Sequence, residues 1–252
     1  MPPRAYAFVH PHRADTAPAL LDLAQSVSGL ILALFMWLHM FFVSSILLGH
    51  DAFWTVARFF EGYFIFGRPL AWLVSLFVAL IGLLIVVHAA LALRKFPANW
   101  RQYQALGSHA RAMRHADTTL WLVQVATGFV MFFLVPAHLY AMFARPELIG
   151  PFASADRVWT GQFWPLYLVL LFVVESHGGI GLYRLAIKWG WFTGGDPART
   201  RLRLARAKWA LTTFFIVLGL LSLAAYIKIG IDHAPHADER YIPAWVNDGH
   251  SP

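Results

Sequence analysis

Residues 164–189 read WPLYLVLLFVVESHGGIGLYRLAIKW. This run is long enough to cross the hydrocarbon layer of a membrane, which takes about 20 mostly apolar residues in a helix. Near its middle it carries Glu175 and His177, at a depth where a carboxyl and an imidazole lose their hydration. Ionisable residues at such a depth are expensive and usually serve a function. The stretch therefore predicts a transmembrane helix that carries a functional site.

The composition of the chain extends this interpretation to the whole molecule. Of the 252 residues, 59% are hydrophobic and 13% are charged, whereas soluble domains average about 25% charged residues. Together with the first run, four others predict a single all-α membrane domain, residues 1–252, built as a multi-pass bundle of five transmembrane helices. The predicted spans are residues 20–48, 70–93, 118–142, 164–189 and 209–227.

Lysines and arginines are distributed unevenly between the two ends of these spans. If the N-terminus is cytoplasmic, fourteen of the 20 lie on the inner side and six on the outer side. The outer six are Arg58, Arg68, Arg145, Arg157, Lys228 and Arg240. Since cytoplasmic loops are enriched in basic residues, the N-terminus is predicted inside and the C-terminal tail outside. This topology accounts for the net charge of +7, so no nucleic-acid partner is predicted.

Four of the twelve histidines lie inside predicted spans, each on a different helix: His39, His88, His138 and His177. With the assigned orientation and a rise of ~1.5 Å per residue, His39 and His138 share an outer level, and His88 and His177 an inner level. The other eight, at positions 10, 12, 50, 109, 115, 233, 236 and 250, fall in loops, tails or helix ends, where solvation explains them.

A single histidine inside a membrane is often only a hydrogen-bonding partner between helices. Two pairs at matched depths instead favour axial ligation of two stacked b-type haems, because neutral imidazole is a common haem ligand. The chain has no cysteine, which excludes c-type haem attachment and thiolate-held iron–sulfur clusters. A haem-free proton or metal transporter lined by the same side chains is the alternative.

Four blocks of the sequence closely resemble the dihaem cytochrome b subunits of quinol:fumarate reductases of the Wolinella type. They are QSVSGLILALFMWLHMFFVSSILLG (25–49), RKFPANWRQYQ (94–104), MRHADTTLW (113–121) and WPLYLVLLFVVESHGGIGLYRLAIKWGWF (164–192). The resemblance runs from about residue 22 to residue 230 and leaves out only the two tails.

The resemblance implies the same histidine pairs that the depths indicate. His88 and His177 would bind an inner, proximal haem, and His39 and His138 an outer, distal haem. Positions associated with the proximal haem propionates match Gln25, Ser26, Trp121 and Lys188, and a position near the distal haem matches Arg157. For Lys188, an ordinary residue reaching from a helix end to the membrane surface is the alternative.

Two carboxyl groups complete the predicted site. Glu61 lies in RFFEGYFIFG (58–67), an aromatic setting that would raise its pKa and suit a proton acceptor. A solvated loop glutamate is the alternative, whereas in the resembling family the matching glutamate accepts protons from menaquinol. Glu175 lies ~200° around its helix from His177, so both cannot face one haem. The matching residue in the family is assigned to transmembrane proton transfer.

The predicted function is that of a membrane-anchor subunit of a succinate:menaquinone oxidoreductase. It would oxidise menaquinol at the outer face and pass electrons through two b haems, with compensating proton transfer. The resemblance implies a FAD-containing flavoprotein subunit and an iron–sulfur subunit on the cytoplasmic side, a dimer of heterotrimers, and the bacterial inner membrane. The b-type subunit of another respiratory dehydrogenase is a second alternative.

Overall fold

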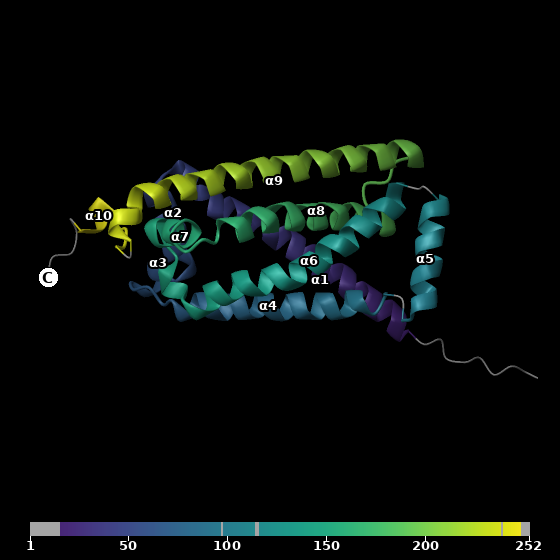
Figure 1. Ribbon diagram of the computed structural model, residues 1–252, viewed down its shortest axis with the longest axis horizontal. Helices are drawn as coiled ribbons and strands as arrows, with labels where there is room; N and C mark the ends of the chain where they lie inside the picture. The colour runs from purple at the N-terminus through teal and green to yellow at the C-terminus, as the bar shows by residue number, and fades with distance from the viewer. Residues whose placement is uncertain (1–15, 97, 114–115, 238, 248–252) are drawn as a thin grey trace, which may run out of the picture.

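The computed structural model describes residues 16–96, 98–113, 116–237 and 239–247. Within these ranges the chain forms helices and no strand, and five helices are long and apolar enough to cross a membrane (Figure 1). The five are α1 (Ala17–Ser44), α4 (Trp72–Leu93), α6 (Ala116–Ala144), α8 (Trp164–Lys188) and α9 (Pro197–His233). The predicted all-α, multi-pass fold is confirmed.

Shorter helices cap the two ends of the bundle. At one end, α5 (Trp100–Met113) lies across the ends of the long helices, and we call this the α5 end (Figure 1). The opposite end, where the yellow end of the chain lies, is called the C-terminal end (Figure 1). It holds η1 (Ser45–Leu48), α2 (His50–Phe60), α3 (Tyr63–Phe66), η2 (Pro146–Leu148), α7 (Pro151–Val158), η3 (Ala234–His236) and α10 (Ala244–Asn247).

Helix α8, which contains the stretch quoted at the outset, packs against α1, α6 and α9, and α4 packs against α1 and α6. Close approach of α8 and α9 depends on Gly219, because a Cβ atom there would lie 2.9 Å or less from side-chain atoms of Leu171 and Met40. Large apolar side chains on α4 and α6, among them Val86 and Phe129, are exposed, as expected for a surface that contacts lipid tails. The buried interior of the bundle is therefore centred on α8.

Helix α9 begins before the predicted span at residue 209. The Asp196 carboxylate accepts hydrogen bonds from the backbone N–H groups of Ala198 (2.9 Å) and Arg199 (3.2 Å), and Pro197 occupies the first helical turn. Such a cap satisfies backbone donors that have no partner within the helix. The polar stretch that follows is therefore helical, and α9 reaches 37 residues.

Candidate haem and proton-transfer sites

The predicted inner histidines lie on α4 and α8, toward the α5 end. His177 Nδ1 lies 2.9 Å from the Gln124 carbonyl oxygen and 3.3 Å from Thr127 Oγ1. His88 Nδ1 lies 3.1 Å from Ser28 Oγ, whose own proton is donated to the Gln25 carbonyl at 3.1 Å. Both rings therefore use Nδ1–H as a donor, which leaves Nε2 to bind a metal ion, the usual arrangement around a ligating histidine.

Two glycines lie against these inner rings. A Cβ atom on Gly29 of α1 would lie 2.9 Å from His88 Cε1, and one on Gly128 of α6 would lie 3.0 Å from His177 Cε1. Each imidazole thus contacts the backbone of the neighbouring helix at a glycine, and any side chain at that glycine would occupy the space of the ring. His177 and His88 lie near each other.

The predicted outer histidines, His39 of α1 and His138 of α6, face each other with ring centroids 6.1 Å apart. Two imidazoles on opposite sides of one metal ion, each with a metal–nitrogen distance of about 2 Å, place their ring centres about 6 Å apart. The His39 ring is stacked on Phe35, and His138 meets the edge of Tyr167. His138 Nδ1 is buried without a hydrogen-bond partner. The spacing of the pair fits a metal bound between the rings.

Three of the residues matched to the proximal propionates gather at the α5 end. Lys188 Nζ donates to Ser26 Oγ at 2.9 Å and forms an ion pair with Asp22, which also pairs with Lys95. Gln25, beside Ser26, has a buried side-chain oxygen with no hydrogen-bond partner. Lys188 is therefore part of a charged cluster on α1 and α8, and this argues against an isolated surface lysine.

The other two matched residues are on separate elements. Trp121 is half-buried on α6, one turn before Gln124, whose carbonyl accepts the His177 hydrogen bond. Arg157 of α7 donates to the Leu148 carbonyl at 2.5 Å and to Met142 Sδ at 3.2 Å. It lies near His138, and burial lowers the pKa of its guanidinium. The structure thus places a partly desolvated cation beside the outer pair.

Glu175 has no solvent exposure, and neither of its carboxyl oxygens has a hydrogen-bond partner of normal geometry. The Trp37 indole of α1 lies beside it, and the indole N–H is also unpaired and buried. His177 contacts Gln124, Thr127 and Gly128 of α6 instead. As the helical geometry predicted, Glu175 and His177 face different neighbours.

Glu61, at the C-terminal end, follows α2 and is 1% exposed. One carboxyl oxygen forms an ion pair with Arg58, and the other is buried without a hydrogen-bond partner. Burial raises the pKa of Glu61, while the charges of Arg58 and Arg240 act in the opposite direction. The partly dehydrated setting is therefore confirmed, and the alternative of a solvated loop glutamate is wrong.

Comparison with known proteins identifies the family. The family model of the succinate dehydrogenase/fumarate reductase transmembrane subunit matches residues 101–219. The fumarate reductase cytochrome b subunit of Wolinella succinogenes is 50% identical over 241 residues, covering 94% of this chain and 93% of the relative. Its counterpart in Helicobacter pylori is 53% identical over 231 residues, 92% of this chain and 89% of the relative. The chain belongs to the family of fumarate reductase cytochrome b subunits.

Membership in this family confirms the resemblance seen in the sequence. It favours the predicted membrane subunit of a quinol:fumarate oxidoreductase over a haem-free transporter or a subunit of another dehydrogenase. The described residues hold no cluster of three or more His, Cys, Asp or Glu side chains of the kind that binds a lone metal ion.

The burial of two polar residues of this cytochrome b subunit was not predicted from the sequence. His233, expected to be solvated at a helix end, is instead buried at the end of α9, where it stacks on Phe152 and lies 2.9 Å from Asp156 Oδ1 of α7. Lys208, counted among inner loop charges, is buried within α9, with Nζ above the rings of Tyr183 and Trp209. Of the other histidines expected to be solvated, positions 10, 12, 115 and 250 lie outside the described residues.

Proposed function

We propose that this chain binds two b haems and carries electrons between menaquinol and the soluble subunits of a fumarate reductase. His88 and His177 would hold the proximal haem, and His39 and His138 the distal haem. The observation that carries the proposal is the 6.1 Å separation of the His39 and His138 rings, the spacing expected for two imidazoles on one iron. The hydrogen bonds at Nδ1 of His88 and His177 support the same role for the inner pair.

When bound, a haem iron with two histidine ligands exchanges one electron at a time. The residues at the two ends of the bundle suit its charged propionates. Gln25, Ser26, Trp121 and Lys188 would position those of the proximal haem at the α5 end, and Arg157 would serve the distal haem. A cation and hydrogen-bond donors stabilise carboxylates at a membrane margin.

The α5 end would face the cytoplasm of a bacterium, with the chain in its inner membrane. This orientation follows from the positive-inside rule. The flavoprotein subunit with its FAD and the iron–sulfur subunit would bind at the α5 end, and the complete assembly would be a dimer of heterotrimers. Supporting evidence comes from the relatives, which are named as subunits of fumarate reductase.

Glu61 would accept a proton from menaquinol at the C-terminal end. Oxidation of a quinol releases two electrons and two protons, so a base must lie beside the reacting hydroxyl groups. Glu61 is buried among aromatic residues and keeps one carboxyl oxygen without a partner. A general base needs such a free acceptor within hydrogen-bonding distance of the substrate proton.

Glu175 would carry protons across the bilayer. Electrons that move inward from an outer quinol work against the membrane potential at about 2.3 kcal/mol per charge for each 100 mV. Protons that cross in the same direction cancel this cost. Both oxygens of Glu175 lack hydrogen-bond partners, so its carboxyl group is free to bind and release a proton in the bundle interior.

Glu61→Gln in the intact complex tests the proposal, because glutamine keeps the size and polarity of glutamate but cannot accept a proton. We expect two bis-histidine haems per chain and loss of menaquinol:fumarate activity. Glu239→Gln, which changes an exposed glutamate at the same end, should retain the two haems and the menaquinol:fumarate activity. Full menaquinol activity in Glu61→Gln would refute the role of Glu61, and a colourless, fully folded preparation would refute haem binding.

A further inference from the structure

The segment after α9 covers the outer side of α2 at the C-terminal end. The Tyr241 hydroxyl donates to Asp51 Oδ1 at 2.6 Å, and the Trp245 ring meets Trp54 at 5.4 Å in an edge-on contact. Between these two residues, Pro243 is fully buried. We call residues 240–246 the C-terminal segment; it is fixed to two successive turns of α2.

One of these contacts continues toward Glu61. Trp54 also meets the Tyr63 ring at 5.8 Å, and the guanidinium of Arg58, one turn further along α2, lies 5.6 Å from the centre of the Trp54 ring. Arg58 in turn forms the ion pair with Glu61. A continuous series of contacts thus runs from Trp245 through Trp54 and Arg58 to Glu61. An arginine placed over an indole is held by cation–π attraction.

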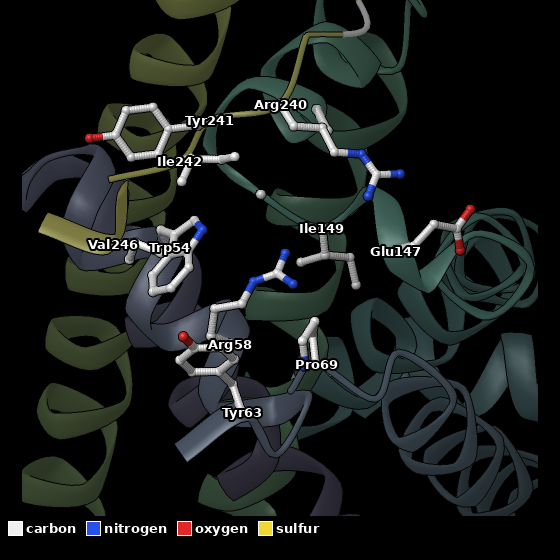
Figure 2. A pocket seen from close by; sticks show the side chains of 12 residues that line it. Trp54, Arg58, Tyr63, Pro69, Glu147, Ile149, Arg240, Tyr241, Ile242 and Val246 are labelled. Atoms are coloured by element: carbon white, nitrogen blue, oxygen red, sulfur yellow. The ribbon is translucent and has the colours of Figure 1, made fainter. Parts of the chain in front are cut away.

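Arg58 also lines a pocket that Glu61 does not reach. The pocket has a volume of about 250 Å³ and lies between α2, α7 and the C-terminal segment. Figure 2 shows Arg58 rising from α2 on one side of it and Arg240 extending from the C-terminal segment on the other. Arg58 therefore contacts Glu61 and also forms part of the pocket wall, opposite Arg240.

We propose that Arg58, held in place by the C-terminal segment, is a positioning residue that keeps Glu61 ionised between turnovers. The inference rests on the proposed role of Glu61 as proton acceptor. The proton passes from a menaquinol hydroxyl to the Glu61 carboxylate and is then released to water at the outer face. Arg58 stays protonated throughout, as arginine does in proteins.

The charges around Glu61 determine in which direction its pKa would change if Arg58 were lost. Burial raises the pKa of Glu61, and Arg58 of α2 and Arg240 of the C-terminal segment oppose that rise. The other titratable groups that line the pocket are Tyr63 of α3, Glu147 of η2 and Tyr241 of the C-terminal segment. An opposite charge at short range lowers a carboxyl pKa by about 1–3 units. Loss of Arg58 would therefore leave Glu61 protonated, and unable to accept a proton, up to a higher pH.

The test compares Arg58→Gln, Arg58→Lys and Trp245→Ala in the intact complex, with Arg68→Gln as the control at an exposed outer arginine. Two readouts are needed: the pH profile of kcat for menaquinol oxidation, and infrared titration of the carboxyl band that disappears in Glu61→Gln. In Arg58→Gln both midpoints should move up by about one pH unit or more. Trp245→Ala should move both midpoints less in the same direction, and Arg58→Lys, which keeps the cation, should leave them close to the wild-type values.

Unchanged midpoints in Arg58→Gln and Trp245→Ala, with normal haem spectra, would overturn the inference. If Arg58→Gln does not fold, Trp245→Ala decides by the same criterion. Full activity of Glu61→Gln would instead overturn the proposed function of Glu61. An inactive Glu61→Gln with unshifted Arg58→Gln overturns only the role of Arg58.

Discussion

Gly29→Ala should weaken the inner haem site without unfolding the bundle. The new Cβ atom would lie 2.9 Å from His88 Cε1 and 3.5 Å from His88 Nδ1. Ordinary contacts of this kind begin at about 3.4 Å, so the ring must move by roughly half an ångström or more. That movement stretches the 3.1 Å hydrogen bond between His88 Nδ1 and Ser28 Oγ, which orients the imidazole.

The expected size follows from two opposing effects. Overpacking of a well-packed site costs about 1–3 kcal/mol, whereas replacing a glycine within a helix by alanine gains up to about 1 kcal/mol. The net cost to the fold as a whole is therefore at most about 2 kcal/mol. The strain, however, falls on His88, so haem affinity at this site should drop roughly 5- to 150-fold at about 1.4 kcal/mol per factor of ten.

The assay is haem content and redox titration of the purified complex. Gly29→Ala should lose, or shift the potential of, one haem only, the one bound by His88 and His177. Gly82→Ala is the matched control on the same helix as His88, because its Cβ would meet Leu139 at an ordinary 3.7 Å. A Gly29→Ala complex with the spectrum and both potentials of Gly82→Ala would show that His88 does not ligate a haem.

Other predictions follow from the same structure. His138→Ala should remove the outer haem and spare the inner one, as two resolved potentials would show; equal loss of both would contradict the pairing. Glu175→Gln should keep both haems and their reduction by succinate but lose quinol-coupled turnover, and wild-type menaquinol:fumarate rates in energised vesicles would argue for a purely structural role. Asp196→Ala should destabilise the start of α9 by about 1 kcal/mol through loss of its cap, measurable as faster amide hydrogen exchange there and refuted by unchanged exchange.

The sequence predicted those features that depend on local pattern and on depth. Apolar runs located the five membrane helices, and counting residues along them paired His39 with His138, which the structure brings together. The same criterion missed the first turns of α9, because a polar helix outside the membrane has no apolar run. Its signal in the sequence is the Asp196-Pro197 cap, which lies twelve residues before the predicted start of the span at residue 209.

Burial of polar groups at the C-terminal end was not predictable in the same way. His233 is buried because Asp156 and Phe152 of α7 pack against it, and these residues are far away in the sequence. The environment of Glu61 likewise depends on an ion pair one turn back and on Arg240, far along the chain. Aromatic neighbours indicated dehydration, but the compensating arginines required the folded chain.

Helix α9 is unbroken from Pro197 to His233, a length of about 55 Å at the usual rise per residue. A bilayer core is only about 30 Å thick, so a rigid rod must protrude from the membrane. Its first turns carry Arg199, Arg201, Arg203 and Arg206, while residues further along pack against α8. A soluble subunit bound to the protruding turns would contact one end of a rigid helix whose other part packs against α8, the helix that carries His177.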